Sequence, residues 1–230
     1  MTSVLPRGTK SPDSLAAKLN KLRAGVLGAN DGIVSVAATV IGVAAATENA
    51  MVIATAGVAS LIAGAFSMAT GEYISVSTQR DTEAALVDRV EQMEHDEMLE
   101  KISANLVAAG VSHDVALAAA GQMAEHDAVE AMSRTEGIDP DDLVNPWHAA
   151  WASFFSFITG ATLPLLTILL IPAAARIPAT FAAVLVALAL TGYVSARLGD
   201  AQPRRAVLRT MFGGALAMAA TYGIGNLFDV

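Results

Sequence analysis

The chain has 230 residues, of which 54% are hydrophobic and 16% charged, with a mean hydropathy of +0.51 and a formal net charge of −8. It contains no cysteine, which excludes disulfides, thiolate metal sites and cysteine nucleophiles. This composition is more apolar than that of an ordinary soluble domain and predicts an integral membrane protein.

Five apolar segments follow one another along the chain, at 24–46, 50–73, 149–171, 177–196 and 206–227. Each is close to the ~20 residues that cross the hydrocarbon core of a bilayer as a helix. We therefore predict an all-α membrane protein with five transmembrane helices and a helical cytoplasmic metal-binding domain between spans two and three. The predicted boundaries are 1–23 for an N-terminal tail, 24–73 for spans one and two, 74–148 for the inserted domain and 149–230 for spans three to five.

The first two apolar segments each contain a carboxylate. Asp31 lies eight residues after Arg23, and Glu72 lies eight residues before Arg80. At the helical rise per residue, both carboxylates lie roughly 12 Å inward from a basic anchor, and Met68 lies one turn further in than Glu72. Ionisable groups within a span are costly and indicate function. Asp31, Met68 and Glu72 are therefore the predicted transport path for a cation.

Small residues are frequent in the same two spans. Gly28 and Gly32 form a pair with the spacing that allows helices to approach closely. The pattern leaves two interpretations open, packing within one chain or a dimer interface. Because five spans are few for a self-contained pathway, we predict a homodimer with the path between its subunits.

The segment 74–148 holds most of the acidic residues and all four histidines. We predict two helices here, separated near Gly110, with Ser112 as the N-cap of the second. Helical spacing predicts one face for Asp88, Glu91 and His95, another for Glu94, Glu97 and Met98, and a stripe of Met123, His126, Asp127 and Glu130 on the second helix. Carboxylate, imidazole and thioether groups favour Fe²⁺, Mn²⁺, Co²⁺ or Zn²⁺ over Mg²⁺ and Ca²⁺. The alternative is that these charges are solvated faces and the methionines pack between helices.

The basic residues indicate an orientation in the membrane. All Lys and Arg residues except Arg176 lie in the tail, in the inserted segment or after the fourth span. With five spans these three regions share one side, which the positive-inside rule makes cytoplasmic. The N-terminus is then cytoplasmic, and the C-terminus is outside.

Three stretches are similar to a known family. "RAGVLGANDGIVSVAATVIGVAAA", "AGAFSMATGEYISVSTQRDTE" and "NPWHAAWASFFSFITGATLPLL" resemble segments of the vacuolar iron transporter family. The resemblance implies five spans, a homodimer, a cytoplasmic metal-binding domain and export of Fe²⁺, often also Mn²⁺, from the cytoplasm in exchange for protons. By match to the motifs, Asp31 corresponds to the family's path aspartate, Met68 to its path methionine, and Glu72 falls in its "GEY" segment.

The resemblance also implies ligands in the inserted domain. The family's paired glutamates would correspond to Asp88 and Glu91 and to Glu97 and Glu100, and its Met/Glu cluster would lie near Met123 and His126. Asp88 and His126 depart from the usual glutamate, which affects metal preference. The full set of predicted metal ligands is Asp88, Glu91, Glu94, Glu97, Glu100, Met123, His126 and Glu130.

We predict a transporter rather than an enzyme, with divalent metal ions, protons and lipid as partners and no permanently bound cofactor. Burial favours a protonated carboxylic acid, whereas metal binding needs the carboxylate, so one site can couple metal movement to proton counterflow. A membrane metal sensor remains open. A ferritin-like oxidase would need Glu-x-x-His pairs, and the sequence contains none. The acidic inserted domain disfavours nucleic-acid binding, and the Ala-rich, cysteine-free composition indicates a bacterial inner membrane.

Overall fold

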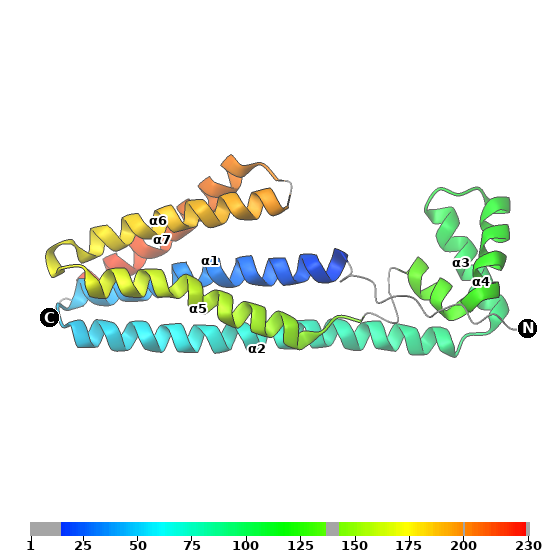
Figure 1. Ribbon diagram of the computed structural model, residues 1–230, viewed down its shortest axis with the longest axis horizontal. Coiled ribbons are helices and arrows are strands. Elements are labelled where there is room, and N and C mark those ends of the chain that lie inside the picture. Colours follow the sequence, from blue (N-terminus) through cyan, green and yellow to red (C-terminus); the bar gives the residue numbers. More distant parts are fainter. Residues whose placement is uncertain (1–14, 137–142, 200, 229–230) are drawn as a thin grey trace, which may run out of the picture. The chain divides into compact units, whose positions relative to one another are not determined.

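The computed structural model describes the backbone of residues 15–136, 143–199 and 201–228, and their side chains from Ala24 onward except that of His126. These residues form helices and connecting loops, with no strand among them. The helices are α1 (Leu15–Ala46), α2 (Ala50–Glu91), α3 (His95–Ala108), α4 (His113–Thr135), α5 (Pro146–Leu170), α6 (Ala173–Leu198) and α7 (Pro203–Leu227) (Figure 1). The prediction of an all-α chain is confirmed.

Five of these helices are long and apolar enough to cross a membrane: α1 from Ala24 onward, α2, α5, α6 and α7. They coincide with the five apolar segments of the sequence, so the prediction of five candidate spans is confirmed. The helix α2 is longer than a bilayer requires, and its second half carries the charged stretch that ends at Glu91. By their contacts, the described residues separate into two units. One contains the residues up to Tyr73 and those from Trp147 onward, and the other is Ile74–Pro146.

The core of the first unit is built around one face of α1. Ile33, Val36 and Ile41 on this face are at most 4% exposed. They pack in a cluster with apolar side chains from the other four candidate spans, including Ile53, Phe157, Val184, Leu188 and Met218. Buried and partly exposed positions alternate around α1 with helical periodicity, which leaves its polar side chains on a different face.

Glycines bring α1 and α5 into backbone contact. A Cβ atom at Gly28 would lie 2.8 Å from the carbonyl oxygen of Ser153, and one at Gly32 would overlap the carbonyl oxygen of Phe157. In return, Gly160 on α5 lies against the carbonyl oxygen of Ala29. Of the two interpretations left open for Gly28 and Gly32, the structure therefore supports packing within one chain.

The link between α1 and α2 is only three residues long and is held by polar contacts of Asn49 and Arg176. The side-chain oxygen of Asn49 accepts hydrogen bonds from the backbone N–H groups of Met51 (2.9 Å) and Val52 (3.4 Å), which caps the start of α2. Arg176 of α6 is buried and donates to the carbonyl oxygen of Glu48 at 3.3 Å. This contact explains why the one basic residue outside the three basic regions lies where it does. The short link makes α1 and α2 an antiparallel pair.

Aromatic side chains gather where the apolar part of α2 ends and α5 begins. The rings of Tyr73 and Trp147 lie 4.8 Å apart, and Trp151 contacts Phe154 and Phe155 with ring centroids 5.7 Å apart in each pair. Both tryptophans are more than half exposed. Tyr and Trp concentrate at membrane–water interfaces, so this cluster marks the expected end of the two spans.

The second unit packs α3 against α4 around a small core of its own. Val90, Met98, Ile102 and Met132 are buried in this core. The methionines at 98 and 132 therefore pack between helices, as the alternative interpretation of the sequence expected.

The second unit contains two helix breaks where the sequence predicted continuous helices, and the first lies between α2 and α3. The predicted first helix ends at Glu91, and after a turn Glu94 stands in extended conformation as the N-cap of α3. The predictions that Asp88 shares a helix face with His95, and Glu94 with Glu97, were therefore wrong. The acidic residues Asp96 and Glu97 suit the first turn of a new helix, where the helix dipole favours negative charge. The turn also places Met98 and Ile102 in the core.

Candidate functional site

Asp31 lies within a continuous stretch of α1, so its carboxylate does not cap a broken helix. Its side chain is partly buried, and the hydroxyl of Ser35, one turn further along, donates a hydrogen bond to Asp31 Oδ1 at 2.7 Å. Hydrogen bonds to a charged acceptor are among the stronger ones in proteins. The carboxylate is thus held in one orientation by its own helix.

The polar face of α1 continues past Ser35. The Thr39 hydroxyl donates to the carbonyl oxygen of Ser35 at 2.9 Å and lies 3.2 Å from the hydroxyl of Ser60 on α2. Asp31, Ser35 and Thr39 are spaced by four residues, so they follow one another along one face of the helix. All of them are partly buried.

The contact between Thr39 and Ser60 sets the register of the antiparallel pair. Each step of four residues along α1 corresponds to a step of four in the opposite direction along α2, so Asp31 is level with Met68. Glu72 is then about 6 Å further toward the N-terminal end of α1. A second contact is consistent with this register, since a Cβ atom at Gly57 would lie 2.7 Å from the Val40 side chain.

On α2, the predicted path residues lie on one face. Ser60, Gly64, Met68 and Glu72 are spaced by four residues. Met68 packs against the edge of the core, and one carboxylate oxygen of Glu72 is buried. Extended along both helices, the register of the Thr39–Ser60 contact puts Asp31 of α1 at about the same level as Met68 of α2. The sequence argument had expected Asp31 to face both Glu72 and Met68 at a shared depth, and that expectation stays a prediction.

Sequence reasoning missed Ser35 and Thr39, and it noted Ser60 only as a small residue of the second span. Single hydroxyl residues are common in membrane spans, and nothing distinguishes them by composition. The signal was their spacing by four or eight residues from Asp31 on α1 and from Met68 on α2.

In the second unit, the predicted carboxylate ligands are mostly spread over exposed surfaces. Asp88 and Glu91 lie near the end of α2, Glu94 precedes α3, and Glu97 and Glu100 lie on α3, all exposed. Glu97 forms an ion pair with Lys101 at 3.0 Å. No three His, Asp or Glu side chains in the described parts of the chain are close enough together to hold a metal ion. The metal site in this unit stays a prediction.

The helix α4 contains the second break, at Asp127, whose backbone is extended (φ −159°, ψ 105°). The Asp127 carboxylate accepts a hydrogen bond from the N–H of Glu130 at 3.0 Å, which is the geometry of an N-cap for the segment that follows. The continuous stripe predicted for Met123, Asp127 and Glu130 was therefore wrong. Capping groups such as Asp stabilise a helix start, and here that start falls inside the predicted helix.

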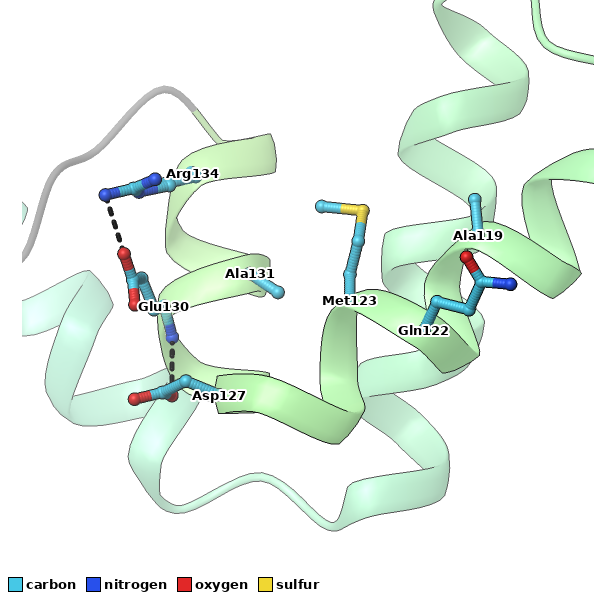
Figure 2. A pocket seen from close by; sticks show the side chains of 7 residues that line it. All are labelled: Ala119, Gln122, Met123, Asp127, Glu130, Ala131 and Arg134. Atoms are coloured by element: carbon cyan, nitrogen blue, oxygen red, sulfur yellow. Dashed lines mark hydrogen bonds and ion pairs between the residues drawn. The ribbon is translucent and has the colours of Figure 1, made fainter. Parts of the chain in front are cut away.

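The break brings three of the predicted residues around one pocket. Met123, Asp127 and Glu130 line a cavity of about 400 Å³ with Ala131 and Arg134. Figure 2 shows Met123 pointing into the space between the two segments of α4, opposite Ala131. Arg134 forms an ion pair with Glu130 at 2.6 Å, on the far side of the pocket from Met123. The side chain of His126 lies outside the described residues.

Comparison with known proteins shows to which family the chain belongs. A family model described as the VIT family matches residues 22–226. The chain belongs to the VIT family. It is 39% identical to vacuolar iron transporter homolog 1 of Oryza sativa subsp. japonica, covering 93% of this chain and 76% of that protein. It is also 39% identical to the vacuolar iron transporter of Acanthamoeba castellanii, over 90% of this chain and 78% of that protein.

A third relative, vacuolar iron transporter homolog 2 of Arabidopsis thaliana, is 35% identical over 91% of this chain and 85% of its own length. The family resemblance predicted from the three sequence stretches is thus confirmed. VIT-family members are transporters, which confirms that the chain is not an enzyme and removes the ferritin-like oxidase as an alternative.

Proposed function

We propose that the chain transports Fe²⁺ across a membrane, with Mn²⁺ as a second substrate, along the polar faces of α1 and α2. The observation that carries this proposal is the Thr39–Ser60 contact between α1 and α2, whose register puts Asp31 at about the level of Met68. A carboxylate and a thioether together favour a first-row transition metal over Mg²⁺ or Ca²⁺. Membership of the VIT family, and relatives named vacuolar iron transporters, support iron as the substrate.

Proton exchange follows from the same carboxylate. Removing a carboxylic acid from water favours its neutral form, whereas binding a divalent cation requires the ionised form and releases a proton. In the proposed cycle, Asp31 alternates between a proton and a metal ion, so metal moves one way and protons the other. Ser35 donates a hydrogen bond to Oδ1 of Asp31, and the carboxylate keeps lone pairs with which it can bind the ion.

The active form in this proposal is a homodimer. Asp31, Ser35, Thr39 and Ser60 are only partly buried within one chain. An ionisable group such as Asp31 is rarely left facing lipid within a span. A second copy related by a two-fold axis would cover each polar face with another.

The direction of transport is out of the cytoplasm, with the N-terminus and the unit Ile74–Pro146 on the cytoplasmic side. The distribution of basic residues supports this orientation, and the composition supports a bacterial inner membrane. In this proposal the second unit binds the same metals. Its pocket lined by Met123 and Glu130 is the best-supported position, because it combines a thioether with carboxylates.

The test is Fe²⁺ uptake by purified protein reconstituted in liposomes under anaerobic conditions. We expect Asp31→Asn to abolish uptake, because the amide keeps the shape of the side chain and loses its charge. Glu48→Gln makes the same change at an exposed carboxylate in the link between α1 and α2 and should transport like the wild type. Uptake by Asp31→Asn at the wild-type rate would refute the proposal.

A further inference from the structure

The hydroxyl groups of Thr39 and Ser60 meet at 3.2 Å from two different helices. The transport proposal stops at Asp31 and Met68 and gives this pair no role. Thr39 lies two turns beyond Asp31, which is about 12 Å along the helix. Any ion that leaves Asp31 toward the C-terminal end of α1 along this face next encounters Ser35 and then the Thr39–Ser60 pair.

The Thr39 hydroxyl lies between two acceptors, the Ser35 carbonyl oxygen at 2.9 Å and the Ser60 hydroxyl at 3.2 Å. Either hydroxyl can donate the proton between Thr39 and Ser60. Both hydroxyl oxygens keep lone pairs that can accept from water or coordinate a cation.

This arrangement differs from that of most hydroxyls in the candidate spans. Thr159 and Thr162 of α5, for example, donate to the carbonyl one turn back in their own helix. The Ser60 hydroxyl instead pairs with the Thr39 hydroxyl on α1, across two helices. Its position also continues the four-residue series of Met68 and Gly64 on α2, so the pair lies in line with the proposed ion site.

We propose that Thr39 and Ser60 form a second station on the path, where a partly hydrated divalent cation is held by hydroxyl oxygens. This inference rests on the proposed transport function. Neutral hydroxyl oxygens replace some of the hydration shell of the ion but carry no charge to retain it. Conduction requires sites that bind well enough for entry and weakly enough for exit. A charged site at Asp31 followed by a neutral site at Thr39 and Ser60 meets that requirement.

The first test needs no transport and uses the absence of native cysteine. Ser60→Cys is treated with a small, charged, water-soluble thiosulfonate reagent, with and without Fe²⁺ under anaerobic conditions. Thr162→Cys is the control. Thr162 is exposed on α5, an apolar candidate span, and in the described contacts its hydroxyl bonds only within its own helix. We expect Ser60→Cys to react because it lies on the proposed ion path, and Thr162→Cys to stay unmodified because a charged reagent does not enter lipid. Fe²⁺ at ten times its dissociation constant fills about nine sites in ten and should slow labelling about tenfold.

The second test separates a station from a simple link between helices. Thr39→Val keeps the shape and removes the hydroxyl. If the pair is a station, the maximal rate of Fe²⁺ uptake falls about tenfold while KM stays within about twofold, since the site at Asp31 is intact. Thr39→Ser should restore the rate, and Thr162→Val should transport like the wild type.

Several results would overturn the station. They are an unreactive Ser60→Cys, labelling that Fe²⁺ does not slow, or a wild-type rate for Thr39→Val. If Thr39→Val transports normally while Asp31→Asn does not, the transport proposal stands and the station falls. If the wild type moves no Fe²⁺, the transport proposal falls, and protection of Ser60→Cys by Fe²⁺ still decides whether the pair binds the ion.

Discussion

The contact between α1 and α5 allows a sharp test of why Gly32 is a glycine. In Gly32→Ala, the new Cβ would overlap the Phe157 carbonyl oxygen and lie 3.0 Å from the backbone nitrogen of Ala161, whereas ordinary contacts begin at 3.4 Å. The helices must therefore separate by several tenths of an ångström at least. Overpacking of this kind costs about 1–3 kcal/mol.

The matched control is Gly213→Ala on α7, where a Cβ would have no atom within 4 Å. Both substitutions gain up to about 1 kcal/mol of helix propensity, so the difference between them isolates the steric cost. We expect Gly32→Ala to unfold about 5 °C below Gly213→Ala, as measured by thermal unfolding of the detergent-solubilised protein. Equal Tm values, together with a loss of dimer in Gly32→Ala alone, would refute packing against α5 and restore the dimer-interface interpretation.

Three further predictions concern other contacts of the chain. Thr39→Cys combined with Ser60→Cys should form a disulfide on mild oxidation. Thr39→Cys combined with Gly64→Cys, about 6 Å further along α2, should not. Mass spectrometry reads both, and the reverse pattern would refute the register of α1 against α2. Asp127→Ala should lower the free energy of unfolding by about 1 kcal/mol through loss of the N-cap, and Asp127→Asn should retain most of it, as followed by circular dichroism; equal losses would refute the capping role. Arg134→Gln should raise the affinity for Mn²⁺ about fivefold, because it removes a positive charge and the ion-pair partner of the proposed ligand Glu130. An unchanged affinity in equilibrium dialysis would place Glu130 outside the metal site.

Much of the fold could be predicted from the sequence because the bilayer imposes a simple rule. A span must be long, apolar and helical, and five segments met that rule. The interruption near Gly110 was also predictable, because glycine is typical of the end of a helix. In the structure this glycine has φ 98°, a conformation that other residues rarely adopt.

The breaks at Glu94 and Asp127 could not be predicted from periodicity. Both lie in acidic stretches that are compatible with a continuous helix and also with a helix start. Tertiary packing decides between them, because each break turns the chain so that apolar residues such as Met98 and Met132 enter the core of the second unit. A face-sharing argument therefore failed in the acidic segment, where the helices break.

The candidate path was predicted in part. Asp31 is conspicuous because a carboxylate in a span is rare, but its partners depend on the register of two helices. That register came from the contact of Thr39 with Ser60, which no local pattern contains.

The central claim is that Asp31 exchanges a metal ion for protons. The most direct measurement records Fe²⁺ entry and internal pH together in the same proteoliposomes, with wild type and Asp31→Asn. The proposal predicts that the wild type alkalinises the interior as Fe²⁺ enters, that an acidic interior speeds uptake, and that Asp31→Asn does neither. Fe²⁺ entry without proton movement, or coupled flux in Asp31→Asn, would contradict it.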